Sequence, residues 1–101
     1  MAREKFQTLT EQMFYVLLCF RQDCCGTDVM EKTRVITDNR VKIGPGTLYN
    51  LIDQFLQEDI IQETKIEGRK KSYILAPKGQ DILDNECNRL QKLINDYKSQ
   101  I

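Results

Sequence analysis

The residues of this chain with the clearest chemical capacity are two groups of cations, and the chemistry they favour is the binding of phosphate. One group is the run Arg69-Lys70-Lys71, which follows Gly68 and has no acid between it and Gly79. The other is Arg40 and Lys42, which precede the segment 44–47. Lysine and arginine neutralise nucleic-acid phosphates, and free N–H groups at a helix start also suit a phosphate. The alternative for the cations is that they belong to a solvated surface of mixed charge. The alternative for the glycines of segment 44–47 is that they only permit a tight turn.

Catalytic and metal-binding chemistry has few residues to use. The chain contains no histidine and no Gly-Lys-Ser or Gly-Lys-Thr phosphate loop, and Cys24 and Cys25 are adjacent, not spaced as Cys-x-x-Cys. We therefore expect neither an enzyme nor a site for a metal or another cofactor. A thiol-responsive regulator is an alternative, because both cysteines directly precede a predicted helix N-terminus, where the helix dipole lowers a thiol pKa.

Composition indicates one small globular domain. The 101 residues are 41% hydrophobic and 30% charged with a formal net charge of zero, so a basic surface must come from the distribution of charge and not from its sum. No apolar run approaches the roughly 20 residues of a membrane span, and the first residues lack the features of a signal peptide. The sequence therefore predicts a cytoplasmic protein without a membrane partner, whose cysteines remain thiols.

Apolar spacing and capping residues predict two helices in the first 40 residues. Thr8 and Thr10 are both plausible N-caps, and Thr8 with Glu11 fits a capping box. The helix that follows should end near residues 22–26. A second, shorter helix is expected over residues 27–37, and residues 41–43 are expected to form a short extended strand.

The strongest amphipathic pattern begins at Pro45, a residue type favoured at the first position of a helix. Its apolar stripe consists of Leu48, Leu51, Ile52, Phe55 and Leu56. The opposite face carries neutral hydrogen-bonding groups and a single charge, and consists of Thr47, Asn50, Gln54, Gln57 and Asp53. Two short β-type runs follow at residues 60–66 and 71–75, which predicts a hairpin with a basic tip.

This order of elements predicts a mainly α fold with a small β hairpin, namely a winged helix-turn-helix over residues 1–76. In that arrangement the third helix enters the major groove of double-stranded DNA, where asparagine and glutamine pair with adenine edges. The hairpin, or wing, contacts backbone phosphates. A winged helix that serves only as a protein-interaction module is the alternative function.

Four short stretches share a pattern with one family of regulators. They are Gly44-Pro45-Gly46-Thr47-Leu48-Tyr49 followed by Leu51, Glu58-Asp59-Ile60-Ile61, Gly68-Arg69-Lys70-Lys71-Ser72-Tyr73, and Pro77-Lys78-Gly79. In this order they resemble the start of the recognition helix, the turn after it, the wing and the turn into the last helix of PadR proteins. The resemblance covers about residues 9–97. One departure is Asp59, where many relatives have a glycine, although aspartate also tolerates left-handed backbone angles.

The resemblance to PadR implies a dimeric transcriptional regulator, usually a repressor, and allows a small-molecule effector between the subunits. It also implies that Thr47, Tyr49 and Asn50 face DNA, although Tyr49 could equally pack on the flank of its helix. The full set of residues expected to bind DNA is Arg40, Lys42, Gly46, Thr47, Tyr49, Asn50, Gln54, Arg69, Lys70 and Lys71.

Residues 77–101 predict a long dimerisation helix that packs on the winged-helix domain as one structural unit. Its apolar residues alternate at spacings of four and three, and we call them the seam: Leu83, Cys87, Leu90, Ile94, Tyr97 and Ile101. A helix that projects past a small domain cannot cover this whole stripe on its own core, so a homodimer is expected, with Cys87 as a small core residue. Its two-fold symmetry matches a palindromic operator. The alternative is a helix that folds back on the first helix of its own chain.

Overall fold

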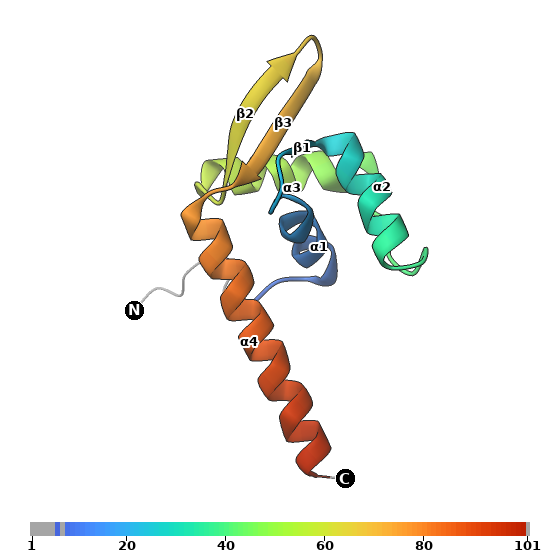
Figure 1. Cartoon of the computed structure of the whole chain (residues 1–101), viewed down its shortest axis with the longest axis vertical. Coiled ribbons are helices and arrows are strands. Elements are labelled where there is room, and N and C mark those ends of the chain that lie inside the picture. Colours follow the sequence, from blue (N-terminus) through green and yellow to red (C-terminus); the bar gives the residue numbers. More distant parts are fainter. Residues whose placement is uncertain (1–5, 7, 101) are drawn as a thin grey trace.

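Helices form most of the part of the chain that the computed structural model describes, which is residue 6 and residues 8–100 (Figure 1). The predicted fold class, mainly α with a small β structure, is confirmed. The elements follow in the order α1 (Glu11–Cys19), β1 (Cys24–Cys25), α2 (Gly26–Ile36), α3 (Pro45–Gln57), β2 (Ile61–Glu67), β3 (Lys70–Leu75) and α4 (Pro77–Ser99).

The first helix begins where a threonine caps it. The hydroxyl of Thr10 accepts a hydrogen bond from the N–H of Met13 at 3.2 Å, which satisfies one of the free donors of the first turn. Of the two expected N-caps, Thr10 is therefore the one used, and the capping box between Thr8 and Glu11 is wrong, because Glu11 is already the first helical residue.

The predicted strand at residues 41–43 is wrong, and a strand that the sequence did not indicate lies elsewhere. The two residues of β1 pair with β3 in an antiparallel register, Cys24 opposite Tyr73 and Cys25 opposite Ser72, which gives a sheet of order β1-β3-β2. In the segment 41–43, by contrast, the backbone N–H of Val41 donates to the Thr37 hydroxyl at 3.0 Å. Side-chain bonding to the backbone thus replaces sheet pairing there, and Val41 and Ile43 are buried without a partner strand.

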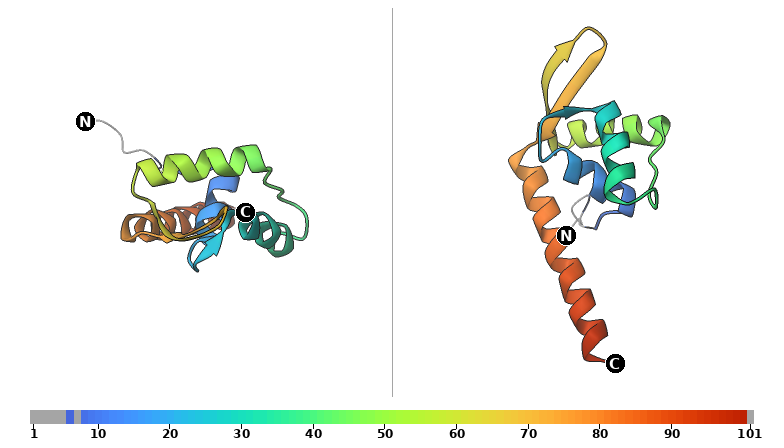
Figure 2. Two further views of the ribbon diagram at one scale, coloured as in Figure 1. Left: turned by 90° about the horizontal axis from the view of Figure 1, so that it is seen from above. Right: turned by 45° about the vertical axis from the view of Figure 1, so that its right-hand side comes forward.

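The hairpin of β2 and β3 projects from the helical core. Its strands pair from Ile61 opposite Leu75 to Glu67 opposite Lys70, with a bulge between Glu63 and Lys65. All residues of β2 after Ile61 are exposed, so only the base of the hairpin contributes to the core. The expected wing is therefore present, and Figure 2 shows it extending away from the helices.

Close backbone packing at the base of the hairpin fixes where α4 starts. The chain leaves α3 through Asp59, which adopts a left-handed φ of 58°, as its side chain allows. The carbonyl of Ile60 then accepts a hydrogen bond from the N–H of Ala76 at 2.9 Å. A Cβ at Gly79 would lie 2.1 Å from the same carbonyl oxygen, so the first turn of α4 can approach the hairpin only with glycine at this position.

Only the first half of α4 packs on the rest of the chain. Leu83 is 2% exposed and belongs to the core, together with Val16 and Leu17 of α1 and Phe20, the C-cap of α1. Leu83 therefore packs within its own chain and is not part of an intermolecular seam. Cys87 is exposed and is not a core residue of the single chain. Beyond it α4 projects from the domain (Figure 1), and Ile101 lies outside the described residues. No helix in the described part of the chain meets the length and hydropathy of a membrane span.

A buried carboxylate joins α4 to the segment before α1. Glu86 is 1% exposed, and its two oxygens accept hydrogen bonds from the Arg89 guanidinium at 2.6 and 2.9 Å. One of these oxygens also accepts from the backbone N–H of Leu9 at 2.9 Å. The Arg89 guanidinium, and to a lesser extent the Leu9 N–H, hold the pKa of Glu86 below its usual value, against the opposing effect of burial.

Glu86→Gln should therefore destabilise the fold by about 1–3 kcal/mol at neutral pH, because it removes charge-assisted hydrogen bonds from a buried acceptor. Since the folded-state pKa is lowered, this contribution is complete above the ordinary glutamate pKa of 4.5 and disappears as the pH falls below it. Urea unfolding of both proteins over a pH series tests this. The exposed Asp81→Asn serves as control, and a difference between wild type and Glu86→Gln that persists unchanged in acid would contradict the prediction.

Candidate nucleic-acid interface

The exposed face of α3 is fixed by the residues that α3 buries. Leu48, Leu51, Ile52 and Phe55 are each at most 5% exposed. The helix starts with Pro45 at its first position and has no acid in its first turn, so its N-terminal N–H groups carry no capping side chain. Thr47, Asn50 and Asp53 consequently lie on the exposed side, as does Gly46, where a Cβ would meet open space. Gln54 is half-buried at the edge of this face.

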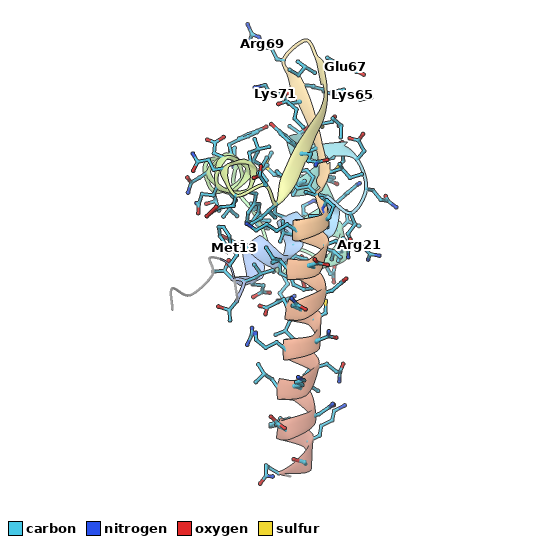
Figure 3. The ribbon with its side chains drawn as sticks, turned by 90° about the vertical axis from the view of Figure 1, so that its left-hand side faces the viewer. Met13, Arg21, Lys65, Glu67, Arg69 and Lys71 are labelled. Atoms are coloured by element: carbon cyan, nitrogen blue, oxygen red, sulfur yellow. The ribbon has the colours of Figure 1, made fainter. Side chains whose placement is uncertain are left out.

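The wing carries cations that form no ion pair within the described residues. Arg69, Lys70 and Lys71 are all exposed. Lys65 on the neighbouring strand is instead paired with Glu67, whose carboxylate lies 3.1 Å from the lysine nitrogen. Figure 3 shows Arg69 at the outermost point of the hairpin and Lys71 closer to the helices. Positive charge is therefore available both at the tip and along one edge of β3.

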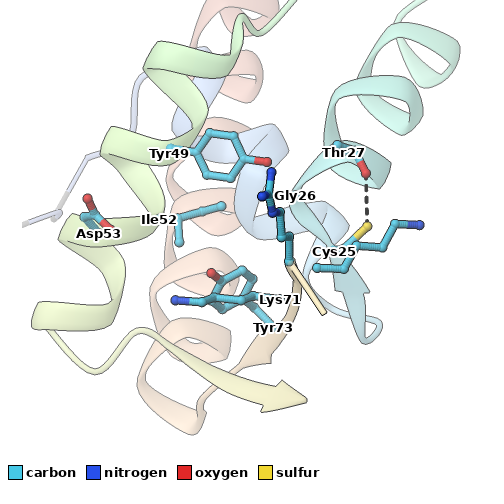
Figure 4. A pocket seen from close by; sticks show the side chains of 10 residues that line it. Cys25, Gly26, Thr27, Tyr49, Ile52, Asp53, Lys71 and Tyr73 are labelled. Atoms are coloured by element: carbon cyan, nitrogen blue, oxygen red, sulfur yellow. Dashed lines mark hydrogen bonds between the residues drawn. The ribbon is translucent and has the colours of Figure 1, made fainter. Parts of the chain in front are cut away.

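A hollow of about 370 Å³ brings α2, α3 and the wing together. We call it the wing hollow (Figure 4), and its lining residues are Cys25, Gly26, Thr27, Tyr49, Ile52, Asp53, Arg69, Lys70, Lys71 and Tyr73. Tyr49 reaches across it, because a Cβ at Gly26 would lie 3.1 Å from the tyrosine Cε1. Tyr49 is still 45% exposed, so it packs on the start of α2 and also presents surface to solvent.

Four of the predicted site residues line this hollow, namely Tyr49, Arg69, Lys70 and Lys71, whereas Gly46, Thr47, Asn50 and Gln54 lie elsewhere on α3. Arg40 and Lys42 lie outside both α3 and the wing. The Arg40 guanidinium forms an ion pair with Glu11 and donates to the Tyr15 hydroxyl at 3.0 Å, so it is bound to α1. Lys42 is exposed and lines a separate shallow hollow with Met30 and Arg34 of α2. The structure therefore separates Arg40 and Lys42 from the three cations of the wing. The ion pair of Arg40 joins residues 29 positions apart, which no local sequence pattern indicates.

The cysteines next to α2 have structural roles. Cys25 is the N-cap of α2, and its thiol donates to the Asp28 carboxylate at 3.1 Å while the Cys25 N–H donates to the same carboxylate at 3.2 Å. These two bonds lower the pKa of Asp28. Burial raises the pKa of Cys24 to about 11, although the charge of Lys32 opposes this effect. The expected lowering of a thiol pKa by the helix dipole is therefore not found at Cys24.

The donor groups in the described part of the chain do not fit a metal site. No three or more side chains of cysteine, aspartate or glutamate are grouped to hold a metal ion within residues 6 and 8–100. The sequence also has no histidine, the residue that most often supplies nitrogen to such sites. Neither the thiols nor the carboxylates of the described residues offer the four convergent donors of a structural zinc site.

Among the solved structures similar to this one are transcriptional regulators. A regulator from Clostridium thermocellum, Cth-833, has a TM-score of 0.72 at 22% identity over 86% of this chain and 91% of that one. A PadR family regulator from Eggerthella lenta has a TM-score of 0.72 at 18% identity over 87% and 79%. RosR of H. salinarum has a TM-score of 0.65 at 14% identity over 92% and 96%. At these identities the likeness shows the winged-helix fold alone.

Sequence comparison gives a different family from the expected one. A model of the ferric uptake regulator family matches residues 9–101, whereas no curated protein matches significantly. The prediction of PadR membership is therefore wrong. The motifs on which it depended encode a helix start, a hairpin turn and a second helix start, features that winged helices of other families also need. The chain belongs to the ferric uptake regulator family.

Proposed function

We propose that this winged helix is a DNA-binding transcriptional repressor that acts as a homodimer on a palindromic operator. The observation that carries the proposal is that three wing cations, which form no ion pair within the described residues, line one hollow with Tyr49 and Asp53 of α3. An exposed helix face beside a cationic hairpin matches the two surfaces of a DNA duplex, the base edges of the major groove and the phosphates that border it.

The polar groups of α3 are suited to base edges. The Asn50 amide can donate and accept at the same time, as an adenine edge requires, and the Thr47 hydroxyl can do either. Both side chains are exposed on the outer face of α3, and α2 and α4 lie on the other side of the core (Figure 2). The face is therefore free to enter a groove about 12 Å wide without moving another element.

The unpartnered end of α4 supports a second copy of the chain as partner. Leu90, Leu93, Ile94 and Tyr97 are large apolar residues that are 36–70% exposed on this helix. Leu90, Ile94 and Tyr97 follow the four-and-three spacing of a coiled coil, so the same stripe from a second copy offers a complementary partner. The helix then has two roles, since Leu83 and Glu86 attach it to its own domain and the distal residues pair with the partner.

The family name refers to ferric uptake, but the donor groups of residues 6 and 8–100 do not fit a metal ion. The proposed DNA binding therefore requires no metal ion. Dimerisation, the wing cations and the base contacts of α3 account for the proposed affinity, and a bound dimer represses by occupying promoter DNA.

Replacing Arg69, Lys70 and Lys71 together by alanine should weaken binding to every DNA sequence, because these cations contact phosphate and not bases. The slope of log affinity against log salt should fall by about 1 for each lost phosphate contact. Fluorescence anisotropy at several salt concentrations measures both quantities. A matched triple variant, Arg21→Ala with Lys32→Ala and Lys78→Ala, removes the same charge outside α3, the wing and distal α4. Equal losses of DNA affinity in the two variants would contradict a role of the wing in DNA binding.

Asn50→Ala should change sequence preference and leave the salt slope unaltered. The amide is expected to contribute roughly 1–3 kcal/mol of discrimination at one base pair. Selection of bound sequences from random duplexes by the wild type and the variant checks this, with Gln57→Ala at the far end of α3 as control. An unchanged preference at every position would exclude Asn50 from base contact.

Leu90→Asp should convert the dimer to monomers, because it places an unpaired charge in an apolar interface. The expected cost is about 3 kcal/mol or more, hence a dimer dissociation constant at least about 100-fold higher. Sedimentation velocity over a concentration series measures the change. Gln91→Asp adds the same charge one residue away from the seam and should leave the dimer intact. A Leu90→Asp dimer of wild-type affinity would refute this interface.

A further inference from the structure

The one acid on the exposed face of α3 has no partner that explains it. Asp53 is exposed, and within the described residues it forms no hydrogen bond and no ion pair. It nevertheless lines the wing hollow together with Arg69, Lys70 and Lys71, and Figure 4 shows it on the α3 side of that hollow. An unpaired carboxylate therefore stands on the surface where DNA is proposed to bind.

A carboxylate in this position repels the DNA backbone. It can only accept hydrogen bonds, while phosphate oxygens also only accept, so contact with phosphate gives repulsion alone. Asp53 must therefore lower the affinity for DNA in general unless a donor on the duplex compensates. In the major groove the available donors are the amino groups of cytosine and adenine.

Of these two bases, cytosine fits a carboxylate better. Cytosine presents its N4 amine in the major groove as a donor, whereas adenine places the acceptor N7 beside its N6 amine. The acceptor oxygens of the Asp53 carboxylate therefore match the cytosine edge, whereas the N7 acceptor of adenine repels them. Asn50 and Asp53 are three residues apart, and three residues advance an α-helix by about 4.5 Å. Asn50 and Asp53 can therefore face neighbouring base pairs on the same side of the helix.

Resting on the proposed function, we propose that Asp53 is a specificity-determining residue that accepts a hydrogen bond from the N4 amine of a cytosine in each half of the operator. It selects a C·G pair at that position and reduces binding to duplexes that lack it. The wing cations then supply affinity for any sequence, and Asp53 limits that affinity to sequences that offer the amine.

Selection from random duplexes by wild type, Asp53→Asn and Asp53→Ala tests the inference. The wild type should recover a C·G pair at one position of each half-site, preferred by roughly 5- to 150-fold in affinity. Asp53→Asn should exchange it for an A·T pair at that position only, because asparagine bonds to N6 and N7 of adenine together. Asp53→Ala should lose preference there, and both variants should bind random DNA more tightly than the wild type.

A control variant and two outcomes separate a failure of this inference from a failure of the proposed function. Asp81→Asn removes the same charge from exposed α4, and it should leave the selected sequence and the affinity for random DNA as in the wild type. If Asp53→Asn and Asp53→Ala recover the wild-type sequence at every position, the role of Asp53 is overturned and the proposed function stands. If the wild type itself recovers no preferred sequence, the proposed function fails first.

Discussion

The burial of one apolar stripe on α3 is the constraint on which the rest of the structure depends. Leu48, Leu51, Ile52 and Phe55 fill the centre of the core, and exposing any one of them would cost about 1.5–3 kcal/mol. Rotation of α3 about its axis is therefore strongly opposed. The same constraint determines which residues face outward, because positions between the buried ones along a helix must lie on its far side.

The wing hollow depends on a second, smaller feature, the pairing of β1 with β3. This pairing ties the base of the wing to the residues that start α2, since Cys25 is both the last residue of β1 and the N-cap of α2. The start of α2 and strand β3, which are more than 40 residues apart in the sequence, thus meet beside α3. In the proposed function, the polar face of α3 and the cationic hairpin act as one surface, with affinity from charge and selectivity from the helix.

The sequence predicts the elements with strong local signals and misses those that depend on tertiary contacts. Pro45 and the apolar stripe after it predicted α3, and the change from helical to strand-like spacing of apolar residues after Ile60 predicted the wing. The two residues of β1 are too few to show a period, and the ion pair of Arg40 with Glu11 joins distant positions. Burial of Leu83 likewise depends on where α1 packs. The assignment to the PadR family was wrong because its motifs encode helix starts and a hairpin turn that winged helices of several families share.

In the proposed complex, α3 and the wing form one surface for DNA, and distal α4 does not touch it. Mapping backbone amide shifts by NMR during titration with a selected duplex tests this most directly. We expect the largest changes at residues 46–54 and 68–71 and little change at residues 35–36 and 90–97. Large shifts over residues 90–97, with residues 46–54 unaffected, would contradict a DNA-binding surface on α3 and the wing.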